Sequence, residues 1–241
     1  MNLKKVFSKF QKLSKSPNFN KFDNFSKYTR RQTIARFLAR YEIFKKQIDI
    51  KGSIIECGVN EGMGLMSLAH FSVTLEPYNY QRKIIGFDTF EGFPSISRLD
   101  NRNKMSFKGS FKQNYNSYKD IKESIKVFNK NRFIKNKTKI NLVKGNAIKT
   151  IPAFVKKNRH LVVSSLWLDF DIYEPTKVAL DNFVPLMPKG GIIIFDELNL
   201  SLIITLVFLI FNLSFVLGVN ILFLRQNSSN FNLSLQTFIC L

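Results

Sequence analysis

Residues 53–64 read SIIECGVNEGMG, and residues 84–94 read IIGFDTFEGFP. Each stretch begins with a short apolar run rich in Ile; the first run ends before Gly58 and the second ends at Asp88. Runs of this kind are typical of strands that are buried on both faces of a parallel sheet. Glycines after such a strand allow a tight turn into a following helix. The two stretches therefore predict two strands of an α/β sheet.

The same alternation of strand and helix continues between residues 51 and 199. We expect strands at 53–59, 83–87, 140–143, 161–168 and 191–195, and helices at about 63–75, 117–130, 148–158 and 174–186. Strands that alternate with helices favour a doubly wound, mostly parallel sheet with helices on both faces. A chain of 241 residues suits one such core, so residues 51–199 are predicted to be a single α/β catalytic domain.

Residues 1–50 are predicted to be an N-terminal helical extension. In the first sixteen residues apolar side chains recur at helical spacing and lysines take the other face, which predicts a short basic amphipathic helix. Such a helix docks on a membrane surface or a partner, or it packs on its own domain; we favour packing. Residues 17–28 are polar and turn-rich. Residues 29–47 read as a second helix, with one apolar side made of Ile34, Phe37, Leu38, Tyr41 and Phe44.

The residues that follow the strands are the candidates for a binding site, because open α/β sheets bind ligands beyond the carboxyl ends of their strands. Gly58, Gly62 and Gly64 allow close approach to the backbone, and Glu56 places a carboxylate near the turn. Asp88 ends the next strand, where a carboxylate can hold a ribose diol. A nicotinamide dehydrogenase would share this logic, but its G-x-G-x-x-G fingerprint is absent from the sequence.

Five sequence blocks together resemble the TylF/MycF-like family of macrocin O-methyltransferases. The blocks are ECGVNEGMG (56–64), GFDTFEGFP (86–94), LVKGNAIKTIP (142–152), LDFDIYEPTKVAL (168–180) and PKGGIIIFDE (188–197). They stand in the family's order, and the resemblance covers about residues 30–199. It implies a Rossmann-like class I methyltransferase that uses S-adenosylmethionine (SAM). The implied acceptor is a hydroxyl of a sugar or of a similar small polar molecule.

On the cofactor side, the resemblance implies that Glu56 and Gly58 lie near the methionine end of SAM and that Asp88 binds the ribose hydroxyls. Residues 145–147 would lie beside the adenine, and the loop after Asp88 would cover the cofactor. The complete set of predicted cofactor-binding residues is Glu56, Gly58, Gly62, Asp88, Thr89, Phe90, Gly145, Asn146 and Ala147. Asn146 stands where the family more often has an acidic residue, and its amide can still donate to or accept from a base edge.

On the acceptor side, carboxylates follow two predicted strands. Carboxylates that converge on one cleft repel one another unless a cation or a shared proton compensates them, which suits Mg²⁺. The resemblance implies Asp169, Asp196 and Glu197 as ligands of an assisting Mg²⁺, with Asp169 as the catalytic residue, acting as metal ligand or general base. The family usually has Asp-Asp or Asp-Asn where this chain has Asp196-Glu197, so the metal can be shifted or absent. Alternatively, Asp171 caps the helix that begins near Glu174, and Glu197 is a solvated side chain.

The chain is strongly basic, with 37 Lys and Arg against 17 Asp and Glu and a formal charge of +20. This balance attracts nucleic acid, anionic membranes or acidic substrates, but we favour the base composition of an AT-rich coding sequence as its explanation. No arginine stripe or RNA-recognition motif accompanies the charge, so we expect no specific nucleic-acid partner, and an RNA methyltransferase ranks last. Two cysteines and no secretory signal favour the cytoplasm. Formation of a homo-oligomer is left open.

The character of the sequence changes after residue 199. Residues 201–241 carry one charge, Arg225, whereas all 17 acidic residues come earlier. Residues 200–224 are long and apolar enough for a transmembrane helix, but they follow Asp196 so closely that lipid would press on the active site. We favour a frameshift near codon 200, with the family's C-terminal strands missing or replaced. The alternative function is then a truncated, inactive or membrane-associated relative of the enzyme.

Overall fold

The computed structural model describes residues 3–97, 100, 107–196, 219–223 and 236–238. Its helices are α1 (Leu3–Leu13), α2 (Asn18–Asp23), α3 (Phe25–Tyr28), α4 (Arg31–Gln47), α5 (Met63–Leu75), α6 (Ser117–Lys130), α7 (Ala147–Lys157), α8 (Tyr173–Phe183) and the 3₁₀ turn η1 (Val184–Leu186). Its strands are β1 (Ser53–Cys57), β2 (Ile84–Asp88), β3 (Ile140–Lys144), β4 (Val163–Leu168), β5 (Ile192–Phe195), β6 (Asn220–Phe223) and β7 (Gln236–Phe238). The strands and helices predicted between residues 51 and 196 are all present, with ends shifted by a few residues.

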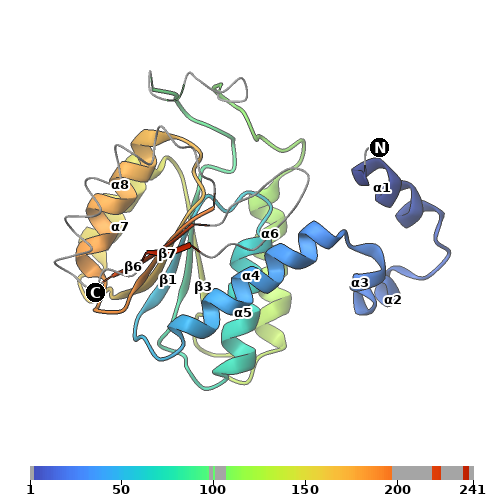
Figure 1. Cartoon of the computed structure of the whole chain (residues 1–241), viewed down its shortest axis with the longest axis horizontal. Coiled ribbons are helices and arrows are strands. Elements are labelled where there is room, and N and C mark those ends of the chain that lie inside the picture. Colours follow the sequence, from blue (N-terminus) through green and yellow to red (C-terminus); the bar gives the residue numbers. More distant parts are fainter. Residues whose placement is uncertain (1–2, 98–99, 101–106, 197–218, 224–235, 239–241) are drawn as a thin grey trace.

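The described strands form one seven-stranded sheet in the order β3-β2-β1-β4-β5-β6-β7. Neighbouring strands are parallel except at one edge, where β7 runs antiparallel to β6. The chain moves outward from β1 to β3, returns to the centre, and moves outward again from β4 (Figure 1). This reversal beside β1 is the topological switch point of a doubly wound sheet. The predicted fold class is therefore confirmed.

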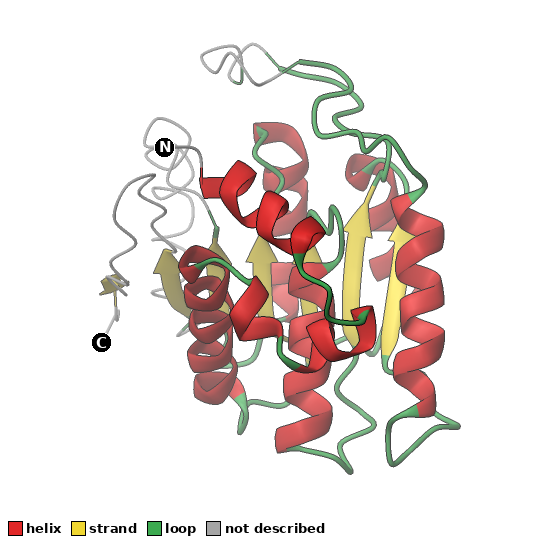
Figure 2. Ribbon diagram, turned by 90° about the vertical axis from the view of Figure 1, so that its right-hand side faces the viewer, coloured by secondary structure: helices red, strands yellow, loops and turns green. Residues whose placement is uncertain are grey.

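Helices cover both faces of the sheet, with α7 and α8 on one face and α4, α5 and α6 on the other (Figures 1 and 2). Side chains alternate along a strand, so each strand contributes to two cores. In β1, Ile55 and Cys57 belong to the core under α7 and α8, and Ile54 belongs to the core under α4, α5 and α6. The next residue on that second face is Glu56, which is buried as well.

Helix α4 packs into the second core. Ile43 and Phe44 of this helix are fully buried there. The apolar side predicted for the helix is partly wrong, because Leu38 is 51% exposed while Arg40 and Gln47 are buried. The helix is turned so that one basic residue, Arg40, faces the ends of the strands, which hydrophobic periodicity alone does not predict.

The amphipathic helix predicted near the N-terminus is present as α1. The prediction of a turn-rich segment at residues 17–28 is wrong, because this segment forms the two short helices α2 and α3. The side chain of Gln11 donates to the carbonyl oxygen of Tyr28 at 2.8 Å, and the rings of Phe10 and Tyr28 stack at 5.3 Å. Tyr28 is buried and joins α1 to α3.

The described parts of the tail, residues 219–223 and 236–238, lie in the sheet. Strand β6 pairs in parallel with β5, and Val219, Ile221 and Leu222 are buried. The tail thus supplies strands of its own at this edge of the sheet. The frameshift near codon 200 and most of the predicted transmembrane segment fall on residues outside the described part. Among the residues that are described, no helix is both long and apolar enough to cross a membrane.

Candidate active site

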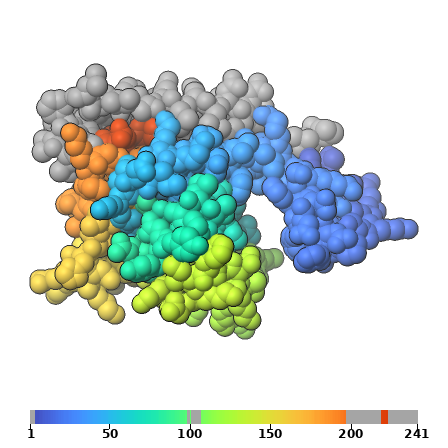
Figure 3. All heavy atoms as spheres, turned by 90° about the horizontal axis from the view of Figure 1, so that it is seen from below, coloured from blue at the N-terminus to red at the C-terminus, as the bar shows by residue number. Residues whose placement is uncertain are grey.

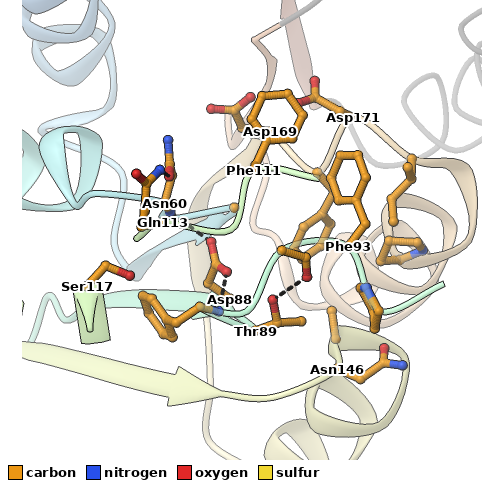
Figure 4. Close-up of a pocket in the computed structure, with 18 of the residues that line it drawn as sticks. Asn60, Asp88, Thr89, Phe93, Phe111, Gln113, Ser117, Asn146, Asp169 and Asp171 are labelled. Atoms are coloured by element: carbon orange, nitrogen blue, oxygen red, sulfur yellow. Dashed lines mark hydrogen bonds between the residues drawn. The ribbon is translucent and has the colours of Figure 1, made fainter. Parts of the chain in front are cut away.

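A cleft of about 500 Å³ lies at the carboxyl ends of the strands, at the switch point between β1 and β4 (Figure 4). Residues that follow β1, β2, β3, β4 and β5 line it, together with the loop between β2 and α6. Cavities of this size bind small molecules and cofactors. In doubly wound sheets the switch point is where such ligands bind, because the loops diverge there.

Gly58 brings the loop after β1 against the loop after β4. Its φ is +94°, and a Cβ at this position would lie 2.0 Å from the carbonyl oxygen of Asp169, so a larger residue does not fit. Strands β1, β4 and β5 end in register. The N–H groups of Asp169 and Asp196 extend the ladder by donating to the carbonyl oxygens of Cys57 and Leu168 at 2.8 and 3.1 Å. The register therefore places Gly58, Asp169 and Asp196 side by side.

Asp88 anchors the glycine-rich loop. One carboxylate oxygen accepts hydrogen bonds from the N–H groups of Val59 and Asn60 at 2.7 and 2.8 Å, and the other accepts from the N–H of Phe90 at 2.7 Å (Figure 4). A carboxylate has about four lone-pair sites, so three are used and one remains for a ligand. Asp88 thus fixes the shape of two loops and still faces the cleft.

Four non-glycine residues of the described chain have positive φ: Asn60, Phe90, Phe111 and Asp171. All four line this one cleft. Asn and Asp tolerate the left-handed region, but for an aromatic residue it is an outlier that costs on the order of 1–3 kcal/mol. Backbone strain of this kind concentrates where a loop must hold a ligand. Its clustering here marks the cleft as the functional site.

The loop between β2 and α6 is tied to the glycine-rich loop. The side-chain amide of Gln113 donates to the side-chain oxygen of Asn60 at 2.9 Å, and the hydroxyl of Tyr115 donates to the carboxylate of Glu61 at 3.0 Å. Both bonds bridge more than fifty residues of sequence. These two hydrogen bonds hold the loop between β2 and α6 in place, where it forms one wall of the cleft.

The same loop is also tied to α8, through Asp100. One oxygen of this buried carboxylate accepts from the backbone N–H of Tyr173 at 2.8 Å, and the other accepts from the N–H and hydroxyl of Ser97 at 2.9 and 2.7 Å. The N-cap residue of α8 is Ile172, which makes no side-chain cap. The N-cap position of α8 is thus Ile172 and not Asp171, and Asp100 supplies an acceptor at the start of the helix.

Asn146 is the N-cap residue of α7. Its side-chain oxygen accepts from the N–H of Ile148 at 3.0 Å, which satisfies one of the free N–H groups at the start of the helix. The residue also lines the cleft, beside Gly145 and Ala147. The cap uses the carbonyl oxygen, so the NH₂ group is the part of the amide that can serve a ligand.

On the opposite side, Asp169 and Asp196 line the cleft with Asp171. The pKa of Asp169 is raised well above its usual value, first because the carboxyl is buried and then because Asp196 and Asp171 are negative neighbours. The guanidinium of Arg40 acts in the other direction and favours the ionised form of Asp169. A carboxyl in this environment takes up a proton more readily than one in water.

Arg40 of α4 places a positive charge near the carboxyl ends of the strands. Its guanidinium lies 3.1 Å from the carboxylate of Glu56 and 3.8 Å from that of Asp196, and it stacks over the Trp167 ring at 4.9 Å from the centroid. A Cβ on Gly64 would lie 1.9 Å from the nearer Glu56 oxygen and 2.8 Å from the Arg40 guanidinium. Gly64, at the start of α5, therefore leaves the space that this ion pair occupies.

Glu56 does not line the cleft, although it was predicted to bind the cofactor. Its side chain is 2% exposed and belongs to the α4 face of the sheet, where it pairs with Arg40. One of its carboxylate oxygens has no hydrogen-bond partner. Burial raises the pKa of Glu56 to about 7, against the opposing effect of Arg40.

The cleft brings together most of the predicted site residues. Nine of them line it: Gly58, Asp88, Thr89, Phe90, Gly145, Asn146, Ala147, Asp169 and Asp196. Gly62 does not; it is the N-cap of α5, with φ of +87°, and packs against Ile121 of α6. The roles assigned to these residues stay predictions.

The predicted metal set is incomplete in the described chain. Glu197 lies outside the described residues, and Asp196 already has Arg40 as a cationic neighbour. Within the described ranges no three His, Cys, Asp or Glu side chains are arranged to hold a metal ion. The described residues alone therefore do not complete the predicted set, which includes Glu197.

Sequence reasoning missed Arg36, Phe111, Gln113 and Ser117, which also line the cleft, and it missed Arg40 behind it. The loop residues lie in a polar stretch with no periodic pattern. For Arg40 the sequence did contain a signal. Arg40 precedes Ile43 by three residues and Phe44 by four, so it lies on the same face of the helix as these two apolar residues.

A parallel sheet of this order, with a glycine-rich loop and an acidic strand end at the switch point, defines a class I methyltransferase fold. The sequence matches the macrocin O-methyltransferase (TylF) family over residues 30–207. The chain belongs to this family and is a methyltransferase. The predicted resemblance is confirmed. No curated protein matches the chain.

Solved structures agree with the family. The calicheamicin methyltransferase CalS11 is 30% identical, with a TM-score of 0.78, over 82% of this chain and 77% of that one. An apo structure of CalS11, described as a TDP-rhamnose 3'-O-methyltransferase, matches at 28% identity and a TM-score of 0.67, over 81% of this chain and 76% of that one. The O-methyltransferase NovP, at 18% identity and a TM-score of 0.54, shares the fold over 72% of this chain and 69% of that one.

Proposed function

We propose that this protein transfers a methyl group from SAM to a hydroxyl of a sugar or a similar small polar acceptor. The observation that carries the proposal is a single cleft with two chemically different sides. The glycine-rich loop, Asp88 and Asn146 form one side, and Asp169 with Asp196 forms the other. A methyl donor and a hydroxyl acceptor need this division, because a cofactor must be held next to a group that accepts a proton.

The cofactor side fits SAM. Gly58 lines the cleft at the end of β1 without a side chain, Asp88 has a lone pair left for a ribose hydroxyl, and the NH₂ group of Asn146 is available to an adenine edge. Bound SAM would supply an electrophilic methyl group on a sulfonium. The protein's part is to hold it at the switch point and to keep water away from it.

On the acceptor side, Asp169 is the residue we assign as general base. Its carboxylate accepts the proton of the acceptor hydroxyl while the oxygen forms its bond to the methyl carbon. Bound SAM would supply the methyl group, and its sulfur would keep the electron pair of the carbon–sulfur bond that is broken. Asp196 and Arg40 are the neighbours that set the charge around Asp169.

Magnesium enters no step of this mechanism. The described residues offer two adjacent carboxylates, one of which lies 3.8 Å from a guanidinium, and no complete metal set. Arg40 supplies part of the charge compensation that a metal ion would otherwise supply. Assistance by Mg²⁺ stays a prediction that depends on Glu197.

A sugar acceptor is supported by the family and by CalS11, which is a TDP-rhamnose 3'-O-methyltransferase. The cleft also has an apolar wall, where the rings of Phe93 and Phe111 lie 5.2 Å apart. The C–H face of a sugar ring packs on such a wall, while its hydroxyls point to the carboxylates opposite.

The test is transfer of an isotopically labelled methyl group from SAM to a panel of free sugars and nucleotide sugars, with and without Mg²⁺. We expect a labelled methyl ether on one hydroxyl of a sugar, and the comparison with and without Mg²⁺ tests the predicted assistance by the metal. SAM binding without transfer to any acceptor of the panel would favour an inactive relative. Transfer to RNA alone would contradict the proposal.

A further inference from the structure

The N-terminal helical unit, residues 3–28 with helices α1 to α3, precedes the part of the chain that matches the family, which begins at residue 30. The unit has contacts of its own. Besides the Phe10–Tyr28 stack, the hydroxyls of Ser14 and Tyr28 lie 3.0 Å apart, and the ammonium of Lys21 donates to the carbonyl oxygen of Gln11 at 3.1 Å. It stands out from the side of the body, joined to it through α4 (Figures 1 and 3).

The unit exposes large apolar side chains. Phe19 and Phe22 are 74% and 77% exposed, and their spacing of three residues places them on one face of α2. Val6, Phe10 and Leu13 follow one another along α1 at spacings of four and three, and all three are exposed as well. A surface this rich in apolar groups is a binding surface rather than a solvated one.

The unit is also strongly basic. Seven of its residues are Lys and one, Asp23, is acidic. Lys5, Lys9 and Lys12 follow one another along α1 at the same spacings as Val6, Phe10 and Leu13, so a basic row runs beside the apolar row. All three lysines are exposed.

We propose that the N-terminal helical unit docks on an anionic membrane surface. A lysine row attracts acidic lipid headgroups, and an adjacent apolar row enters the boundary between headgroups and acyl chains. A second copy of the unit fits less well, because it would bring two clusters of like charge together. The proposal concerns where the enzyme is held and is independent of the methyl acceptor. Docking would place the cleft near substrates carried on the membrane.

The experiment uses the full chain and two kinds of vesicle, phosphatidylcholine alone and phosphatidylcholine mixed with phosphatidylglycerol, in a sedimentation assay. We expect the protein to bind the anionic vesicles, to leave the neutral ones in the supernatant, and to be released as salt is raised. Equal binding to both kinds of vesicle, or binding to neither, overturns the proposal.

Two variants address the exposed rings of α2 and the basic row of α1. Phe19→Ser/Phe22→Ser removes the most exposed rings, and Lys5→Glu/Lys9→Glu/Lys12→Glu reverses the charge; each should weaken binding to anionic vesicles by about tenfold or more. The matched control is Tyr78→Ser/Phe133→Ser, which removes two rings of the body that are each 73% exposed. The control should bind like the wild type.

Circular dichroism and thermal unfolding show whether each variant keeps its fold. Folded variants that bind vesicles as the wild type does overturn the proposal. The proposal is also overturned if the protein binds no vesicles but forms a concentration-dependent dimer that is lost in Phe19→Ser/Phe22→Ser. The N-terminal helical unit would then join two copies of the chain. Tight binding of single-stranded RNA without vesicle binding overturns it as well.

Discussion

The guanidinium of Arg40 lies 3.1 Å from the carboxylate of Glu56, and both groups are buried, with side-chain exposures of 9% and 2%. Arg40 comes from α4 and Glu56 from β1, so the pair ties α4 to the strand that precedes the glycine-rich loop. A second contact, to Asp196 at 3.8 Å, extends the tie to β5. The pair therefore lies directly behind the cleft and connects its two sides.

Removing one member of this pair leaves the other buried and unpaired. We expect Arg40→Met to lower the free energy of unfolding by about 3–5 kcal/mol. The double variant Arg40→Met/Glu56→Gln should recover much of this loss, since no charge is then stranded. Urea unfolding of the two single variants and the double variant gives the coupling energy. Losses that simply add would show that the two side chains do not interact.

We predict that Gly64 is required because the Arg40–Glu56 ion pair occupies the space of a side chain at this position, and not because the cofactor binds there. Gly64→Ala puts a methyl group where the Glu56 carboxylate lies, and we expect it to cost about 1–3 kcal/mol of unfolding free energy. In a Glu56→Ala background the same change should cost less, because the space is then free. An equal cost in both backgrounds would point to a different neighbour.

Stability should fall as pH rises toward neutrality. The pKa of Glu56 is raised from 4.5 to about 7 in the folded protein, so the folded state binds this proton more tightly than the unfolded state does. The bound proton stabilises the folded state by on the order of 3 kcal/mol. This stabilisation is fully present below pH 4.5 and is lost as the pH rises through about 7. Glu56→Gln should flatten the pH profile of the unfolding free energy. A wild type that becomes more stable from pH 5 to pH 8 would refute this account.

Asp169→Asn should separate binding from chemistry. The amide keeps the shape of the side chain but takes up no proton, so we expect turnover to fall by about 10²- to 10⁴-fold while SAM affinity changes little. Single-turnover transfer and SAM titration measure the two quantities on one sample. Full activity in the folded variant would remove Asp169 from the mechanism.

The sequence predicted the features that depend on local pattern. The apolar runs located the strands of the core, and the fixed geometry of a doubly wound sheet then placed Gly58, Asp88, Asn146 and Asp169 around one cleft. Glu56 was predicted to lie near the cofactor, whereas alternation along β1 puts its buried side chain with Ile54 on the face of α4. Asp100 could not be predicted, because its partner Tyr173 lies on another element and no periodic pattern links the two residues. For Arg40 the spacing to Ile43 and Phe44 indicates the face of the helix, but not the pairing with Glu56.

If this cleft binds SAM, isothermal titration of the purified protein with SAM detects that binding. Asp88 shapes the glycine-rich loop and has one lone pair for the ribose, so Asp88→Ala removes both functions. The account predicts micromolar binding by the wild type and affinity weaker by at least about tenfold in a folded Asp88→Ala variant. A folded wild type that binds no SAM, or a variant with unchanged affinity, would contradict it.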